Sequence, residues 1–346
     1  MNKGVVLVLG GGGGKGAYQI GVWKALRELD VEPNITAVAG TSVGALNALL
    51  FATGDYELAE SIWSNLSKEQ ILTPKTLSEY LGDIMGKSTS QIANIIQSRI
   101  KPLVGTVEVS VLPLIALNIA RFLFQTGSFS RSGLSQLIEQ NRIAEQTFQS
   151  GIDIYAVCAS LPKLQPHTFH LNDYTSDVIK DIVLASSAIP GVFPPQKIGR
   201  TEYYDGGLCN NYPYDIEAIK EYKAIISVPL SVDDGIKRLE KSDNPIGTKI
   251  IEILPSKHLG SFIEGTLDFS ADGARKRIDL GYRDTIANLR LAHQHWKTEK
   301  KIQQADAEFW AILQKADQIH KESVKRRIEK KRAIYEMMRW KNGNED

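Results

Sequence analysis

The sequence predicts an α/β fold, and two observations carry that prediction. Two units of strand, glycine-rich turn and helix follow one another within residues 1–55. Short apolar runs typical of strands then return between residues 152 and 254, separated by helical or turn-rich segments. Alternating elements of this kind are typical of a central sheet whose faces are covered by helices.

The first unit opens with residues 5–9, VVLVL, which are β-branched or apolar on both faces. Such a run is typical of a buried parallel strand. Five glycines follow at residues 10–14, and over residues 17–29 the apolar positions recur near helical spacing. We therefore expect a strand, a tight glycine loop and a helix.

The second unit repeats this order. Residues 35–39 form another apolar run, and residues 40–44 form a turn with a glycine at each end. Residues 45–52 are small or apolar and predict a helix directly after the turn. Two such units predict an α/β sheet rather than a helical bundle.

The middle of the chain, residues 56–150, loses this alternation and resembles several helices with Gly, Ser and Thr breaks, so we interpret it as a helical insertion. Helical patterns return over residues 269–292, and a long charged helix is predicted over 296–341. We expect one main domain, residues 1–295, and a charged helical C-terminal extension, residues 296–346. The later strands are predicted at residues 152–159, 201–204, 224–229 and 249–254.

Composition and charge exclude several classes of protein. The 346 residues are 42% hydrophobic and 23% charged, which is ordinary for a globular chain and excludes disorder over the whole length. Lys and Arg number 41 and Asp and Glu number 40, so the net charge is +1. This balance gives no reason to expect a nucleic acid partner.

The cysteines and the apolar runs of the sequence indicate in which cellular compartment the protein is expected. Cys158 and Cys209 form no sequence pair and stand near no histidine cluster, which argues against disulfides and zinc sites and fits a reducing compartment. We expect no signal peptide, because the run 5–9 leads into glycines, and no spanning helix, because the apolar stretch 109–124 is too short. A cytoplasmic protein is predicted, with a peripheral position on the inner face of the membrane left open.

The glycine loop after the first strand fits the pattern G-x-G-x-x-G, which several anion-binding folds share. A dinucleotide site would need an acidic residue where the second strand ends, and that position is Gly40. A nucleotide P-loop would need glycine at Leu9 and Ser or Thr at Gly16. What remains is an anion hole built from outward-facing backbone N–H groups. The loop residues are Gly11, Gly12, Gly13, Gly14, Lys15 and Gly16.

The turn after the second strand, Gly40-Thr41-Ser42-Val43-Gly44, fits the nucleophile elbow G-x-S-x-G. The alternative is an ordinary tight turn in which Ser42 only caps the following helix. The upstream glycine loop favours the elbow, because a serine nucleophile needs N–H donors at the developing oxyanion.

Two kinds of side chain could act as the general base for Ser42, a histidine or an aspartate. His258, His293 and His295 come late in the chain, after acidic residues, so the chain order Ser, Asp, His of an α/β-hydrolase can be drawn. That fold has several strands before its elbow, however, and here only one precedes it. Asp205 is better placed, because it ends the predicted strand 201–204 and two glycines, Gly206 and Gly207, follow it. Taken alone, Asp205 would equally fit an ordinary turn.

Together the glycine loop 11–16, the elbow 40–44 and the triplet 205–207 resemble the patatin-like phospholipases in order and spacing. The segments 21–26 and 185–195 look like the family's flanking sequences, so the resemblance covers about residues 4–55 and 150–230. It implies a three-layer α/β/α fold with a mainly parallel central sheet. It also implies Ser42 as nucleophile, Asp205 as its base and an oxyanion hole from the loop Gly11 to Gly14, chiefly Gly12 and Gly13.

The implied function is a serine acyl hydrolase that cleaves fatty-acyl ester bonds of phospholipids or other lipids and releases free fatty acid and lysolipid, without a metal or other cofactor. The alternative is a patatin-like effector that stays inactive until a partner or small nucleotide signal switches it on and that then degrades membrane phospholipid.

Two segments outside the motifs bear on partners. Residues 109–124 would suit contact with a lipid surface and equally a buried helix of the insertion. Residues 321–341 hold nine Lys or Arg and three Glu, a local balance of +6 on a helix with an apolar stripe. Such a helix can lie on anionic lipid or pack on the body or on a second subunit, so a homo-oligomer formed through it is possible.

Overall fold

A computed structural model of the chain describes residues 3–74, 129–147, 150–231 and 249–342. The chain divides into two compact units, Met1–Asn288 and Leu289–Asp346, next to the predicted boundary at residue 295. The predicted insertion falls partly outside the described residues, and the apolar stretch 109–124 lies wholly outside them. Within the described residues, no helix combines the length and the apolar character that a membrane crossing needs.

The first unit is built on one mixed sheet, which has eight strands in the described part of the chain. Five neighbouring strands, β10-β9-β1-β2-β5, run parallel, and β6, β8 and β7 add antiparallel pairings beyond β5. The prediction of an α/β fold with a mainly parallel sheet is confirmed. The strands are β1 (Lys3–Leu9), β2 (Ile35–Thr41), β5 (Asp153–Ser160), β6 (Gln165–His170), β7 (Gln196–Ile198), β8 (Thr201–Asp205), β9 (Tyr222–Val228) and β10 (Lys249–Glu252).

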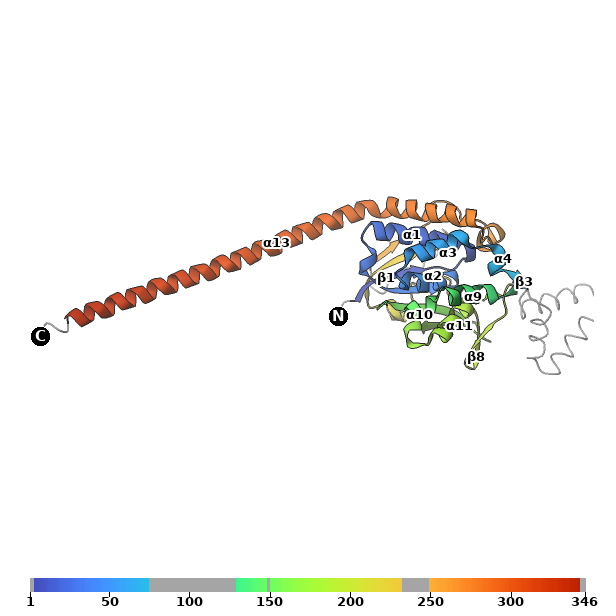
Figure 1. Ribbon diagram of the computed structural model, residues 1–346, viewed down its shortest axis with the longest axis horizontal. Helices are drawn as coiled ribbons and strands as arrows, with labels where there is room; N and C mark the ends of the chain where they lie inside the picture. The colour runs from blue at the N-terminus through green and yellow to red at the C-terminus, as the bar shows by residue number, and fades with distance from the viewer. Residues whose placement is uncertain (1–2, 75–128, 148–149, 232–248, 343–346) are drawn as a thin grey trace, which may run out of the picture. The chain divides into compact units, whose positions relative to one another are not determined.

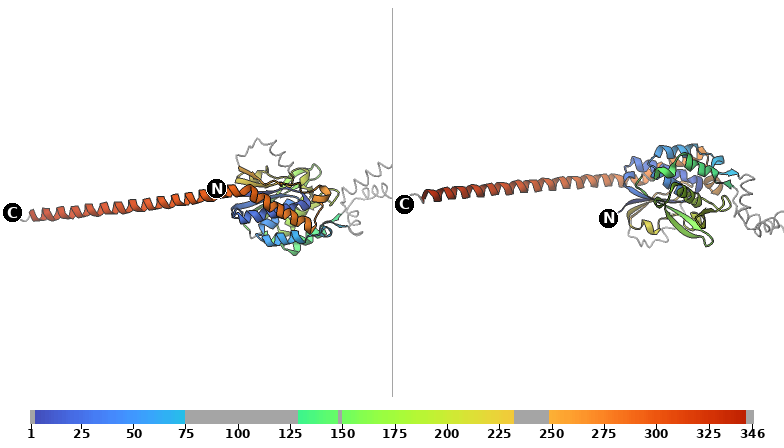
Figure 2. Two further views of the ribbon diagram at one scale, coloured as in Figure 1. Left: turned by 90° about the horizontal axis from the view of Figure 1, so that it is seen from above. Right: turned by 60° about the horizontal axis from the view of Figure 1, so that its bottom comes forward.

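Helices cover one face of this sheet (Figures 1 and 2). They are α1 (Ala17–Glu28), α2 (Val43–Ala52) and α11 (Ser176–Ser186), with α3 (Tyr56–Asn65), α4 (Lys68–Ile71), α9 (Ser132–Gln140) and α10 (Ile143–Gln146) from the described part of the predicted insertion. In the same part of the chain, the two-residue strands β3 (Thr73–Pro74) and β4 (Phe129–Ser130) pair antiparallel as a separate small sheet.

Among the described residues, the opposite face of the sheet is covered by the segment between β8 and β9. There Val6, Val8 and Ala39 pack against Tyr212 and Ile219, which belong to a segment with only a short 3₁₀ turn, η7 (Glu217–Ile219). Alternate residues of the central strands are thus buried on both faces, as the apolar run 5–9 predicts.

Strand register brings the chain's functional turns to one edge of the sheet. The parallel strands β1 and β2 end side by side, with Leu9 opposite Gly40, so the glycine loop and the elbow leave the sheet together. On the other side of β2, Thr41 is opposite Val157 of β5, and the next residue of β5, Cys158, is opposite Asp205 of β8. The two loops and Asp205 therefore meet where the strands end.

The last helix, α13 (Ala271–Asn342), is continuous where two helices were predicted. Its first part packs closely on α1 within the first unit. A Cβ atom on Gly21 would lie 1.8 Å from the carbonyl oxygen of Ile278, so glycine is what lets the two backbones approach. Tyr18 and Asp284 add a buried hydrogen bond of 3.1 Å between the same helices.

Candidate active site

Ser42 stands on the turn between β2 and α2, where the backbone takes a conformation that residues other than glycine rarely adopt. Its φ is 57° and its ψ is −126°. A Cβ atom on Gly40 would lie 2.2 Å from the carbonyl oxygen of Gly44, so the turn is too tight for another residue there. Strained backbone of this kind clusters at functional sites, because the surrounding fold must hold it in place.

The hydroxyl of Ser42 points to Asp205 rather than to its own helix. Ser42 stands at the N-cap of α2, but its side chain makes no capping hydrogen bond, which speaks against the alternative in which it only caps that helix. Ser42 Oγ donates to Oδ2 of Asp205 at 2.6 Å, and both residues are 5% exposed. A short hydrogen bond to a buried carboxylate polarises the hydroxyl, as a nucleophile requires.

Asp205 is held by its own turn. Its second oxygen, Oδ1, accepts a hydrogen bond from the backbone N–H of Gly207 at 2.7 Å, and Gly206 begins the short 3₁₀ turn η6 (Gly206–Leu208). Burial raises the pKa of Asp205 to about 6, and the hydrogen bonds from Ser42 and Gly207 offset part of that rise. A carboxylate with this pKa is a stronger base than an exposed aspartate and is still ionised at neutral pH.

His258, one of the histidines considered as bases, does not take this place. Nδ1 of His258 accepts a hydrogen bond from the backbone N–H of Gly260 at 3.1 Å, and His258 does not line the cavity at Ser42. The side chains of His293 and His295 lie outside the described residues.

A cavity of about 280 Å³ opens at Ser42 and Asp205. Its polar wall includes the glycine loop, Lys15 and Asn211, and its apolar wall is formed by Ile189, Pro190, Leu208 and Leu230. The volume is close to the lower end of the range for small-molecule sites. The cavity combines an activated hydroxyl, backbone donors and an apolar surface, which suits an acyl group.

The four glycines predicted for the oxyanion hole take different positions. Gly11, Gly12 and Gly13 line the cavity, and Gly13 has a φ of +56°, which favours glycine. The N–H of Gly11 donates to the carbonyl oxygen of Asn211 at 3.0 Å, so it is already engaged. Gly14 does not line the cavity, and its carbonyl oxygen lies 3.5 Å from Nη1 of Arg277.

The remaining motif residues support these turns. Lys15 lines the cavity beside the loop. Gly16 lies against Val43 at the start of α2, where a Cβ atom would be 2.5 Å from the valine Cγ2. The glycine loop and the elbow are therefore packed against each other, which fixes the loop relative to Ser42.

Ser186 is a supporting residue that sequence reasoning noted only as part of a flanking segment. It is fully buried at the end of α11. Its Oγ accepts a hydrogen bond from the backbone N–H of Ser42 at 2.9 Å and donates to the carbonyl oxygen of Val157 at 2.6 Å. Ser186 thus ties the strained elbow to β5. No local signal could identify it, because both partners are remote in sequence.

Arg277 of α13 is a second supporting residue without a sequence signal. Its side chain is 9% exposed and pairs with Asp268 at 2.7 Å, and the same guanidinium donates to the carbonyl oxygen of Glu264 at 2.9 Å. The segment it holds includes Thr266, which lines the cavity and lies against Gly13. A buried, multiply bonded arginine of this kind stabilises the loop that backs the proposed oxyanion hole.

Replacing Ser186 with alanine is expected to lower both stability and turnover. The change leaves the buried N–H of Ser42 without its acceptor, which costs about 1–3 kcal/mol of unfolding free energy. Ser187→Ala is the matched control, because the hydroxyl of Ser187 bonds only within its own helix, to Val183 at 2.9 Å. Denaturant unfolding and ester hydrolysis of both variants check this, and equal effects in the two would contradict the role of Ser186.

Comparison with known proteins bears on the family. The family model described as patatin-like phospholipase matches residues 7–217. The curated lysophospholipase nte1 of Aspergillus terreus is 50% identical over 50 residues, which are 14% of this chain and 3% of that protein. The chain thus matches only a small fraction of that relative's length.

Solved structures resemble the fold at low identity. VipD from Legionella pneumophila has a TM-score of 0.48 and 16% identity, with 83% of this chain and 67% of that chain covered. The type III effector ExoU of Pseudomonas aeruginosa has a TM-score of 0.39 and 16% identity, with 85% and 54% covered. Human GIVD cytosolic phospholipase A2, in complex with methyl gamma-linolenyl fluorophosphonate, has a TM-score of 0.35 and 10% identity, with 85% and 59% covered.

The family model covers well over half of the chain, including the glycine loop, the elbow and the triplet at Asp205. The resemblance drawn from the sequence motifs is confirmed, and the chain belongs to the patatin-like phospholipase family.

Proposed function

We propose that this protein hydrolyses fatty-acyl ester bonds of lipids, with Ser42 as the nucleophile and Asp205 as its base. The observation that carries the proposal is the 2.6 Å hydrogen bond between Ser42 Oγ and Asp205 Oδ2 on a strained turn inside a cavity. Membership of the patatin-like phospholipase family supports a lipid substrate.

The proposed reaction is acyl transfer to water. Ser42 Oγ attacks the ester carbonyl carbon while Asp205 takes the hydroxyl proton, and the N–H groups of Gly12 and Gly13 stabilise the oxyanion. Asp205 then passes the proton to the leaving alcohol, which departs as the lysolipid. A water molecule, deprotonated by Asp205, attacks the acyl-enzyme, and Ser42 regains its proton as the fatty acid leaves.

An apolar surface near the cavity suits a substrate that comes from a lipid aggregate. Leu208 lines the cavity and is nevertheless 46% exposed. Phe262 and Ile263 are 53% and 72% exposed at the start of a π-helical turn, η8 (Phe262–Thr266), whose last residue lines the cavity. Large exposed apolar side chains gathered near a site mark an interaction surface. A peripheral position on the inner face of the membrane remains a prediction.

Replacing Ile263 with aspartate is expected to reduce activity on phospholipid vesicles about tenfold, because the side chain no longer enters the lipid surface. Hydrolysis of a soluble p-nitrophenyl ester should be unchanged. Ile263→Leu keeps an apolar side chain of the same size and should retain both activities. An equal loss on the two substrates, or no loss on vesicles, would show that this turn does not contact lipid.

The experiment that tests the proposed function is fatty-acid release from mixed phospholipid vesicles by the wild type and by Ser42→Ala. A folded wild type that is silent alone would favour the alternative of a switched effector, and the search would then turn to an activator.

A further inference from the structure

The second compact unit, Leu289–Asp346, carries a row of large apolar side chains that are exposed to solvent within that unit. Within the part of this unit whose side chains are described, six such residues of α13 are between 41% and 66% exposed. They are Ile302, Phe309, Trp310, Ile312, Leu313 and Ile319. Single exposed apolar residues are ordinary, but a row of them along one helix marks a surface that another element covers.

The spacing of this row is that of a coiled-coil seam. Residues 302, 305, 309, 312, 316 and 319 are Ile, Ala, Phe, Ile, Ala and Ile, with alternating steps of three and four. Ile302, Phe309 and Ala316 take the a positions, and the other three take the d positions. Four of the six exposed residues, Ile302, Phe309, Ile312 and Ile319, fall on this a/d pattern, and Trp310 and Leu313 lie beside it at b and e positions.

We propose that α13 pairs with α13 of a second copy of this chain as an antiparallel two-stranded coiled coil over residues 302–319. In this pairing the a residues of one copy face the d residues of the other. Ile302 lies opposite Ile319 of the second copy and Phe309 lies opposite Ile312, while Ala305 lies opposite Ala316. Large side chains meet large ones, and the alanine layers let the helices approach closely.

The charges beside the seam determine the direction. In an antiparallel pair the g positions of the two helices face each other. Lys301 then faces Glu322 of the second copy, and Glu308 faces Lys315, so every g position of the seam meets the opposite charge.

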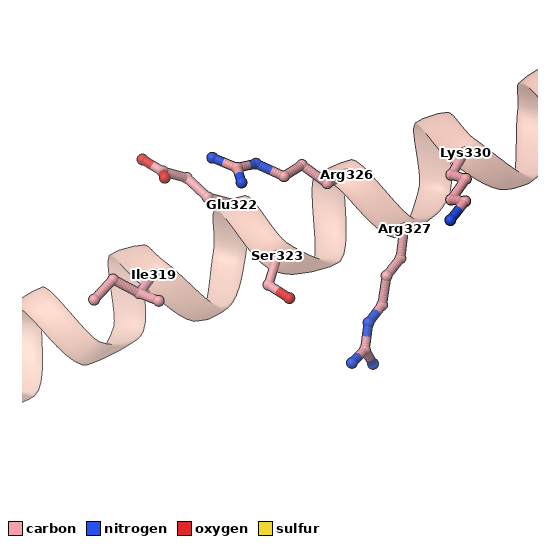
Figure 3. Close-up of a pocket in the computed structure, with 6 residues that line it drawn as sticks. All are labelled: Ile319, Glu322, Ser323, Arg326, Arg327 and Lys330. Atoms are coloured by element: carbon pink, nitrogen blue, oxygen red, sulfur yellow. The ribbon is translucent and has the colours of Figure 1, made fainter.

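A parallel pair would place like charges together. It would bring the two segments 321–341 side by side, each with nine Lys or Arg and three Glu, and like charges at short range repel. Figure 3 shows where this basic segment begins: Ile319 is followed by Ser323 and Arg326 at the next a and d positions, so the apolar seam ends in this heptad register. The antiparallel arrangement directs the basic segments of the two copies to opposite ends.

The first test is the mass of the full-length chain in solution by light scattering. The wild type should have twice the mass of the 38.3 kDa chain. The double variant Phe309→Asp and Ile312→Asp should dissociate at least about 100-fold more readily, because two charged layers replace the centre of the seam. Gln314→Asp, at an outward f position, should remain dimeric. Circular dichroism of each variant shows whether α13 is still helical.

The second test is disulfide cross-linking in a Cys209→Ser background, since Cys158 is buried. The double variant Ile302→Cys and Ile319→Cys should give a covalent dimer on oxidation, and each single variant should not, because the pairing joins residue 302 of one copy to residue 319 of the other. Cross-linking of the single variants would overturn the antiparallel direction. A wild type that is monomeric at every concentration would overturn the pairing, as would a monomer whose tail instead binds phosphatidylserine vesicles.

Discussion

Replacing Ser42 with alanine is expected to reduce fatty-acid release from mixed phospholipid vesicles by at least about three orders of magnitude. The variant keeps the cavity and the glycine loop but lacks the hydroxyl that donates to Asp205 Oδ2. Without that oxygen no acyl-enzyme can form, and the residual rate would come from binding and the oxyanion donors alone. The measurement is the initial rate of fatty-acid release at saturating vesicle concentration.

The control for this result is Ser187→Ala, which also removes one hydroxyl from a residue beside the site, and that hydroxyl donates to the carbonyl oxygen of Val183 rather than to Asp205. It should retain nearly full activity. Thermal unfolding of Ser42→Ala should stay close to that of the wild type, which separates loss of chemistry from loss of fold. Substantial fatty-acid release by a folded Ser42→Ala variant would remove Ser42 from the mechanism.

The elbow could be predicted from the sequence because its determinants are local. The apolar run 35–39, the glycines at 40 and 44 and the small residues of the helix are contiguous, and they specify a tight strand-to-helix turn with little help from the rest of the chain. The partner of Ser42 is 163 residues away. No periodicity or spacing predicts such a contact, and Asp205 was chosen over the histidines on its strand-end position and on the family resemblance.

Elements that depend on a neighbour for their stability were not predicted. The strand β6 contains Gln165, Pro166 and two histidines, and it is held at the sheet by six paired positions with β5 rather than by its own propensity. The three-residue strand β7 exists because a tight turn folds it back on β8. Pairing across the sheet outweighs local preference in both cases.

The prediction of two separate helices, where the structure has the single helix α13, was wrong for a different reason. The predicted break between residues 292 and 296 followed a change in composition, from a partly apolar segment to a charged one. A change in composition does not end a helix, whereas proline or a C-terminal glycine does. No proline follows Pro255 in the sequence, and α13 runs through the predicted break. The shift in composition instead lies close to the boundary between the two compact units at Asn288.

Replacing Asp205 with asparagine is expected to lower the rate of ester hydrolysis by about three orders of magnitude and to remove its dependence on pH near 6. In the wild type the base must be ionised, and burial raises its pKa to about 6. The kcat/KM of the wild type should therefore fall about tenfold for each pH unit below 6, whereas the variant has no group to titrate there. The measurement is a pH profile on a soluble ester.

The burial of Asp205 also predicts how stability depends on pH. Ionisation of this carboxyl group raises the activity but lowers the free energy of unfolding. The folded-state pKa of about 6 lies above the ordinary value of 3.8, so the ionised carboxylate destabilises the fold. That cost is absent below pH 3.8, grows between pH 3.8 and 6, and is complete above pH 6. Two pKa units correspond to about 3 kcal/mol, so the asparagine variant should gain up to about that much unfolding free energy at pH 7 to 8 and lose the advantage near pH 4.

Asparagine can keep the site's hydrogen bonds, because its oxygen can accept from the N–H of Gly207 and its amide can donate to Ser42. The matched control is Asp181→Asn, since burial also raises the pKa of Asp181 but that residue bonds to Gln196 and does not line the cavity. It should leave activity unchanged. If the Asp205→Asn variant is slow and more stable than the wild type, Asp205 is a catalytic base whose burial lowers the stability of the fold, as is common for active-site groups. A slow but less stable variant would assign Asp205 a structural role, and a fast one would remove it from the reaction.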